Sequence, residues 1–309
     1  MSPTLPPTLS NDPQQKLRSF VPTKEFFVGI DSDGCAFNSM EVKHNDSFSV
    51  NLIKFFGFQA LSRQVHQAWD FVNLYSQTRG CNRFKAIVLV CDQLREMPKV
   101  KSAGISIPEL PYLKNWIKTE TQLGNPKLKE KIEAATGAEK AELELVFAWS
   151  KAVNKTIEEI VHNLPPFPKV EPCLVKLRER ADILVVSATP QEALDREWQQ
   201  HGIEKYVAFI AGQEMGSKTE HLTLAAKGKY PAENVLMVGD APGDFKAARD
   251  VGALFFPINP GDEEASWERF YDEGISKFFG KQYAGAYEAK LLAEFDRLLP
   301  KDPPWKTSK

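Results

Sequence analysis

The chain has 309 residues, of which 42% are hydrophobic and 26% are charged, and its 39 Lys and Arg nearly balance its 41 Asp and Glu. These values predict a globular protein with one large core or two domains, and they argue against partners such as nucleic acid or an acidic membrane surface. Four cysteines without a CxxC pair favour reduced thiols over a disulfide framework or a zinc site. With no signal peptide or transmembrane pattern, we expect a cytoplasmic protein without a membrane partner; its oligomeric state stays open.

The first predicted strand ends in two acids. Residues 1–22 are rich in Pro, Ser and Thr and are predicted to form an extended or disordered tail. The apolar run at 26–30 then indicates a buried strand, which Asp31 and Asp33 follow directly. Carboxylates at the carboxyl end of a parallel strand lie where open α/β sheets bind ligands, and two so close together need a cation, a shared proton or a basic neighbour. The alternative is an ordinary turn, since Asp, Ser and Gly are common turn residues.

The next region, residues 37–169, has a helical pattern, and we call it the helical block. Its apolar residues recur at spacings of three and four, although the stretch 85–94 fits a strand or a helix equally well. Arginines and an amide beside a glycine can bind a second anionic or hydroxylated part of a substrate, whereas a solvated loop is the alternative. The candidate substrate contacts in the helical block are Lys43, His44, Arg79, Asn82 and Arg83.

A proline-rich connection at 165–172 precedes a regular alternation of strands and helices. This spacing predicts an α/β fold with a doubly wound parallel sheet, which the strand at 26–30 joins, so that the helical block is an insertion. Two amphipathic helices beyond Pro260 are predicted to pack on the core. The expected divisions are a core of residues 23–36 and 170–299, the helical block, and a C-terminal tail of residues 300–309.

Polar residues follow two of the later strands. Ser187 comes directly after an apolar strand, where a hydroxyl and free backbone amides can hold a phosphate. Thr189, Pro190 and Glu192 predict a capping box that starts a helix, so we expect Thr189 only to cap it.

A second capping box, Ser217 with Glu220, places Lys218 in the first turn of a helix. A cation there opposes the helix dipole, at a cost of about 0.3–1 kcal/mol, unless nearby carboxylates or a phosphate compensate. A solvated surface lysine is the alternative.

Asp240 ends another apolar strand, and Asp244 lies in the first turn of the helix that follows. An acidic first turn needs no ligand, because the dipole favours a negative side chain there. Together with the two acids near residue 31, however, they gather up to four carboxylates at one sheet edge. Such a cluster suits Mg²⁺, which takes few carboxylates and also binds substrate phosphate.

The chain resembles the haloacid dehalogenase-like hydrolase superfamily in the order of its motifs. These are, from the N-terminus, DSDG, the serine after VV, the lysine and GDxxxD. The resemblance implies a Rossmann-like core in which Asp31 attacks phosphorus to form an aspartyl-phosphate, while Asp33 serves as general acid and then base. It further implies that Ser187 and Lys218 hold the phosphoryl group. Mg²⁺ would be carried by Asp31, Asp240 and the backbone carbonyl of Asp33, with Asp244 supporting, and the helical block would be the mobile cap.

Within that superfamily, the acid at Asp33 indicates phosphate ester chemistry rather than dehalogenation. Cys35 departs from the usual threonine, but a small side chain under the turn should suffice. We therefore expect a Mg²⁺-dependent phosphoric monoester hydrolase that acts on a small phosphorylated metabolite. The alternatives are a phosphomutase that resembles β-phosphoglucomutase, or a non-catalytic phosphate-binding or scaffold protein. The physiological substrate stays open.

Overall fold

A five-stranded parallel sheet, in the order β3-β2-β1-β4-β5, organises the computed structural model, which describes residues 12–307. The strands are β1 (Phe26–Ile30), β2 (Ala181–Val186), β3 (Phe209–Ala211), β4 (Val235–Gly239) and β5 (Leu254–Pro257). The strand before the two acids is the central one, since Gly29 pairs with Leu184 of β2 and Met237 of β4. The predicted α/β fold class with a doubly wound parallel sheet is confirmed.

Successive side chains of β1 point to opposite faces of the sheet, and helices cover both faces. Phe26, Val28 and Ile30 belong to one hydrophobic cluster, and Phe27 belongs to another. The first cluster is filled mainly by α10 (Val170–Leu177), α11 (Gln191–Gln200), α14 (Glu263–Arg269) and α15 (Ile275–Phe279). The second is filled mainly by α1 (Gln15–Arg18), α12 (Lys218–Ala225) and α13 (Pro242–Val251).

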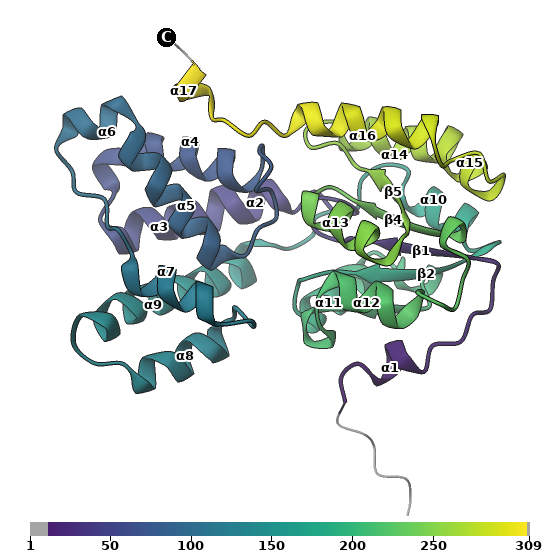
Figure 1. Ribbon diagram of the computed structural model, residues 1–309, viewed down its shortest axis with the longest axis horizontal. Coiled ribbons are helices and arrows are strands. Elements are labelled where there is room, and N and C mark those ends of the chain that lie inside the picture. Colours follow the sequence, from purple (N-terminus) through teal and green to yellow (C-terminus); the bar gives the residue numbers. More distant parts are fainter. Residues whose placement is uncertain (1–11, 308–309) are drawn as a thin grey trace, which may run out of the picture.

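The last long helix, α16 (Ala286–Leu298), covers the outer edge of β5 (Figure 1). Phe255 donates its backbone N–H to Glu288 Oε1 at 2.9 Å, and its carbonyl accepts from the Tyr283 hydroxyl at 2.7 Å. An edge strand otherwise exposes unpaired backbone groups. The C-terminal helices therefore close the sheet on this side and pack on the core, as predicted.

The helical block lies beside the sheet and has a hydrophobic cluster of its own, which includes Trp69 and Trp149 (Figure 1). The stretch 85–94 lies within α5 and is therefore helical. Within the described residues, no helix is long and apolar enough to span a bilayer. The α-helices of the helical block are α2 (Met40–Lys43), α3 (Ser49–Phe56), α4 (Ser62–Asn73), α5 (Arg83–Glu96), α6 (Pro98–Ala103), α7 (Pro111–Thr119), α8 (Asn125–Ala134) and α9 (Gly137–Ile160). The limits 37–169 stay a prediction as domain boundaries.

Shorter helical turns connect these elements. The 3-10 turns are Gln59–Leu61, Glu204–Tyr206, Gln213–Met215 and Ala232–Asn234, and the π turns are His44–Phe48 and Phe270–Gly274. The second π turn joins α14 to α15, so the first of the two helices predicted beyond Pro260 is interrupted there.

Part of the predicted N-terminal tail, residues 1–22, is helical rather than extended; residues 1–11 lie outside the described residues. Residues 15–18 form α1, because Leu17 is fully buried against α12 and neighbouring parts of the sheet. Lys229 Nζ also donates to the carbonyls of Leu17, Arg18 and Phe20 at 3.2, 3.1 and 2.7 Å. Burial of one leucine and these hydrogen bonds hold a segment whose composition indicates disorder.

The predicted C-terminal tail, residues 300–309, contains one helical turn in its described part. Here α17 (Pro304–Thr307) packs on the helical block, with the ring centroids of Trp305 and Phe71 5.5 Å apart. Lys306 forms an ion pair with Glu96 at 2.5 Å. Figure 1 shows this segment, in yellow, leaving α16 on the sheet and reaching across to the helical block. A single tryptophan thus provides the apolar contact by which this polar segment packs on the helical block.

Candidate active site

Three buried carboxylates meet at the carboxyl ends of β1 and β4. Asp31 follows β1, Asp240 follows β4, and Asp244 lies in the first turn of α13. Each offers one ligand oxygen, and these oxygens all lie within 4.8 Å of one another. We call these three residues the acid cluster. The chain runs away from β1 and β4 in opposite directions, so the cluster lies at the switch point of the sheet, where such folds bind ligands.

Lys218 reaches the acid cluster from the first turn of α12. Its Nζ lies 2.7 Å from Asp31 Oδ2 and 2.5 Å from Asp244 Oδ1. The predicted capping box with Ser217 and Glu220 is confirmed and begins this helix. Burial lowers the pKa of Lys218, but the carboxylates of Asp244 and Asp31 outweigh it and raise the pKa well above its ordinary value. Lys218 therefore stays an ammonium and offsets part of the negative charge.

The remaining charge of the acid cluster favours a cation. Burial raises the pKa of Asp31, against the effect of Lys218, and raises the pKa of Asp240 to about 6. Asp240 Oδ1 has no hydrogen-bond partner among the described residues, although it is buried. Clustered carboxylate oxygens with one unpartnered member fit a hard divalent cation such as Mg²⁺.

Arg79 enters this site from the turn after α4 in the helical block. Its Nε and Nη2 lie 2.8 and 2.7 Å from Asp240 Oδ2, and its Nη1 donates to the Leu74 carbonyl at 2.8 Å. The side chain is almost completely buried. Arg79, predicted as a substrate contact, thus has a carboxylate of the acid cluster as its partner.

Asp33 is held apart from the acid cluster by its own set of donors. Ser39 Oγ donates to Oδ1 at 2.6 Å, Thr189 Oγ1 donates to Oδ2 at 2.7 Å, and Lys43 forms an ion pair with Oδ1. Burial raises the pKa of Asp33, but Lys43 and these hydrogen bonds outweigh it and lower the pKa to about 2. Asp33 is therefore ionised in this state.

The expectation that Thr189 caps a helix is wrong. No side chain of the N-cap residue, Pro190, caps α11, and the Gln191 N–H instead donates to Glu214 Oε2 at 2.9 Å. Thr189 Oγ1 instead donates to Asp33, because a hydrogen bond to an ionised carboxylate is stronger than one between neutral groups. Ser187, buried at the end of β2, accepts from the Thr189 N–H at 3.2 Å.

Three other predicted substrate contacts have partners inside the helical block. His44 Nδ1 accepts from Trp69 Nε1 at 2.9 Å, and burial and Arg79 lower the pKa of His44 to about 3. Asn82 caps α5 and donates to the Leu123 carbonyl, while Arg83 donates to Ser150 and Asn154. The structure therefore brings Lys43 and Arg79 to the acids, and not His44, Asn82 or Arg83.

A further carboxyl near the acids was not indicated by the sequence. Glu197 on α11 accepts from the Ser32 hydroxyl at 3.3 Å, and Trp198 Nε1 donates to the same hydroxyl at 3.0 Å. Burial and the negative charge of Asp33 raise the pKa of Glu197 to about 7. In the sequence, only the helical spacing from Gln191 indicates where Glu197 points. That signal is too weak to identify Glu197 as a site residue.

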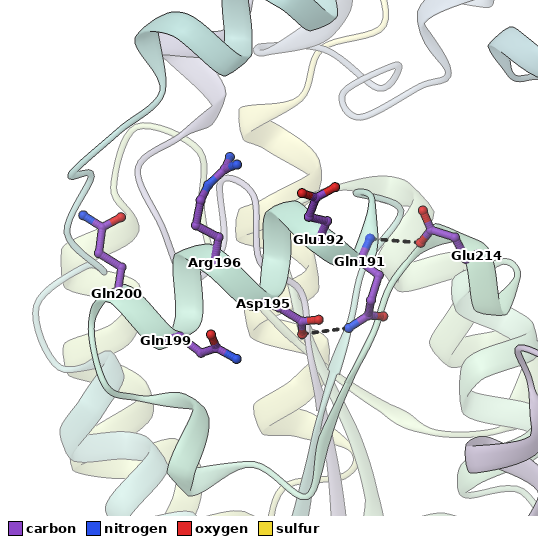
Figure 2. Close-up of a pocket in the computed structure, with 7 residues that line it drawn as sticks. All are labelled: Gln191, Glu192, Asp195, Arg196, Gln199, Gln200 and Glu214. Carbon is purple, nitrogen blue, oxygen red and sulfur yellow. Dashed lines mark hydrogen bonds between the residues drawn. The ribbon is translucent and has the colours of Figure 1, made fainter.

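Two hollows in the structure differ in their lining residues. Figure 2 shows an open groove along α11, lined by polar side chains such as Glu192, Asp195 and Arg196, and it contains no member of the acid cluster. A smaller cavity of about 100 Å³ adjoins Arg79. It is lined by Gly34, Asn38, Met40, Glu41, Tyr75, Arg79 and Glu263.

A family model described as haloacid dehalogenase-like hydrolase matches residues 112–257, which include Ser187, Lys218 and both later acids. The match covers just under half of the chain. The resemblance stated from the motifs is confirmed, while DSDG lies outside the matched residues. In place of the usual threonine, Cys35 is fully buried beneath the DSDG turn, with Sγ 3.6 Å from the Val238 carbonyl oxygen.

Solved structures of low sequence identity resemble this chain. A candidate phosphoglycolate phosphatase from Lactobacillus delbrueckii subsp. bulgaricus is 16% identical, with 81% of this chain and 92% of that chain covered and a TM-score of 0.46. A candidate beta-phosphoglucomutase from Bacteroides vulgatus is 16% identical, with 89% and 99% covered and a TM-score of 0.47. A haloacid dehalogenase-like family hydrolase from Xanthomonas campestris is 12% identical, with 84% and 97% covered and a TM-score of 0.42. No curated protein matches the chain.

Proposed function

We propose that this hydrolase is a Mg²⁺-dependent phosphatase that cleaves a small phosphorylated metabolite through an aspartyl-phosphate on Asp31. The observation that carries the proposal is the separation of two acids in different surroundings. Asp31 lies in the acid cluster against Lys218, whereas Asp33, two residues later, is held by Ser39, Lys43 and Thr189. Two carboxyls with different partners suit a nucleophile and a separate acid/base.

The acid cluster is suited to hold Mg²⁺ through Asp31, Asp240 and Asp244. When bound, Mg²⁺ would offset the charges of the phosphoryl oxygens and of the nucleophile, so that two anions can approach each other. Lys218 would add a second positive charge beside Asp31 and the phosphoryl oxygens. The Ser187 hydroxyl, at the end of the strand next to β1, would donate to one of those oxygens.

In the first step, an Asp31 carboxylate oxygen would form a bond to phosphorus as the bond from phosphorus to the leaving oxygen breaks. Asp33 would then give that oxygen its proton, and would later take a proton from the water that hydrolyses the aspartyl-phosphate. Because Asp33 is ionised in this structure, it must first acquire a proton. That proton would come from solvent, because the contact with Lys43 favours the ionised form of Asp33.

A cytoplasmic location and a small-molecule partner belong to the same proposal. The four cysteines Cys35, Cys81, Cys91 and Cys173 are all free, which suits a reducing compartment. The near-zero net charge gives no reason to expect nucleic acid or a membrane surface as a partner.

The direct test is phosphate release from an aryl phosphate with and without Mg²⁺. Wild type should release phosphate with Mg²⁺ and stop when EDTA is added, and Asp31→Asn should release none. Asp195→Asn, on α11 outside the acid cluster, is the matched control and should keep full activity. Full activity of Asp31→Asn or in EDTA would refute the proposal, and isomerised product without free phosphate would indicate a mutase. A panel of phosphorylated metabolites would then identify the substrate.

A further inference from the structure

The ion pair between Arg79 and Asp240 joins the helical block to the acid cluster. We propose that Arg79 is a positioning residue for the metal site, which the helical block therefore completes. Arg79 would hold Asp240 by one oxygen and leave the other oxygen for the cation. This inference rests on the proposed function, because it assigns the acid cluster to Mg²⁺.

The contacts of the Asp240 carboxylate divide between its two oxygens. Oδ2 receives both Nε and Nη2 of Arg79, at 2.8 and 2.7 Å. Oδ1 is buried and has no partner in the described part of the chain. A buried carboxylate oxygen without a donor is costly, and a cation bound there would remove that cost. Residues that hydrogen-bond to a metal ligand commonly orient it in this way, with one oxygen fixed and the other facing the metal.

Arg79 is itself held in place, so it can transmit an orientation. Its Nη1 donates to the Leu74 carbonyl at 2.8 Å, and its backbone N–H donates to the Ser76 carbonyl at 2.9 Å. The Thr78 hydroxyl closes the same turn by donating to the Val72 carbonyl at 2.6 Å. A guanidinium that is already fixed by one hydrogen bond, on a backbone turn that is closed by two more, loses less freedom when it binds a carboxylate.

Two glycines allow the helical block to approach the acid cluster this closely. A Cβ atom on Gly34 would lie 2.8 Å from Arg79 Nη2 and 2.7 Å from Asp240 Oδ2, between the two partners. A Cβ on Gly80 would lie 3.1 Å from the Ala241 Cβ, next to Asp240. Both glycines have positive φ angles, +73° and +70°. The last residue of the DSDG motif thus leaves room for the arginine as well as for the turn.

Two other roles for Arg79 make different predictions. If Arg79 occupied the place of the cation, its removal would tighten Mg²⁺ binding. If it bound an anionic part of the substrate, its removal would weaken substrate binding and leave Mg²⁺ binding unchanged. The donors already committed to Asp240 and Leu74 favour the positioning role over the substrate role.

The test is the affinity of the full chain for Mg²⁺ alone, measured by titration calorimetry without substrate. Arg79→Ala should bind Mg²⁺ about 10- to 100-fold more weakly than wild type, the range found when residues behind a metal ligand are removed. Arg79→Lys keeps the charge but cannot place two N–H groups on one oxygen. Its affinity for Mg²⁺ should therefore lie between those of wild type and Arg79→Ala. Circular dichroism checks that each variant is folded, and Arg79→Lys serves as the folded variant if the alanine variant is not.

Arg83→Ala is the matched control, because Arg83 is a neighbouring arginine whose partners Ser150 and Asn154 lie in the helical block. It should bind Mg²⁺ as wild type does. In an Asp240→Asn background, Arg79→Ala should cause no further loss, since its partner is already altered. Equal or tighter binding by the Arg79 variants would overturn this inference alone, whereas absence of Mg²⁺ binding by wild type would overturn the proposed function with it.

Discussion

The ammonium group of Lys218 lies 2.7 Å from Asp31 Oδ2, and the same group lies 2.5 Å from Asp244 Oδ1. One side chain from α12 thereby joins residues that follow two neighbouring strands. The contact neutralises the carboxylate that we propose as nucleophile and keeps it beside the rest of the acid cluster.

Lys218→Met should lower aryl phosphate hydrolysis by about 10²- to 10³-fold, the usual effect of removing one fixed donor from a charged site. It should also lower the free energy of unfolding by about 3–5 kcal/mol, because two buried carboxylates lose their partner. Activity assays and urea unfolding measure both effects. Lys227→Met, an exposed lysine just after α12, is the control. Unchanged activity of Lys218→Met would contradict the role of the ammonium.

Lys43→Met should destabilise the protein more at pH 7 than at pH 4.5. In wild type, the pKa of Asp33 is lowered to about 2, so the pair adds stability above the unfolded pKa of about 4 and loses it as the pH falls toward 2. Without Lys43, burial raises the pKa of Asp33, and the carboxyl takes up a proton as the pH falls. Urea unfolding should give a loss of about 2–5 kcal/mol at pH 7 that shrinks at pH 4.5. A loss that is equal at both pH values would exclude this account.

Thr189→Val should weaken the hold on Asp33 while leaving α11 intact. The lost hydrogen bond to a charged acceptor should cost about 1.5–3 kcal/mol of stability, measured by unfolding, and the pKa of Asp33 should rise. Thr223→Val is the control, since its hydroxyl only donates to the Thr219 carbonyl on an exposed helix surface. Loss of helical protection at residues 191–195 in Thr189→Val would restore the capping role instead.

Trp305→Ala should loosen the helical block without affecting the sheet. The indole is a partly buried partner of Phe71, and it is carried by a segment that comes from the opposite part of the molecule. Hydrogen exchange should therefore become faster in α4 and α5, while β1 and β4 keep their protection. Trp305→Phe retains a ring against Phe71 and should behave more like wild type. Uniform or absent changes would show that this contact does not hold the block.

Most of the fold could be predicted because its signals are local. Apolar runs such as 26–30 and 235–239, and the capping box at Ser217, depend only on neighbouring residues. The order of the motifs also placed Asp31, Lys218 and Asp240 at one sheet edge. The helical turns in the terminal segments were not predicted because Leu17 and Trp305 are single apolar residues in polar segments, and their partners lie elsewhere in the chain.

Local sequence patterns could not predict which side chains pair within the site. Arg79 pairs with a residue 161 positions away, and Thr189 with one 156 positions away. In both cases a buried carboxylate attracts a side chain that local sequence assigns to a solvated loop or a helix cap. Only the folded arrangement of the helical block and the sheet decides between these partners.

The proposed aspartyl-phosphate is tested by locating the phosphoryl group during turnover. Wild type is mixed with an aryl phosphate and Mg²⁺, quenched in acid within one turnover, digested and examined by mass spectrometry. We expect a phosphoryl group on Asp31 that is absent without Mg²⁺ and absent in Asp31→Asn. Rapid phosphate release with no modified peptide, or a phosphoryl group on a different residue, would contradict the proposed mechanism.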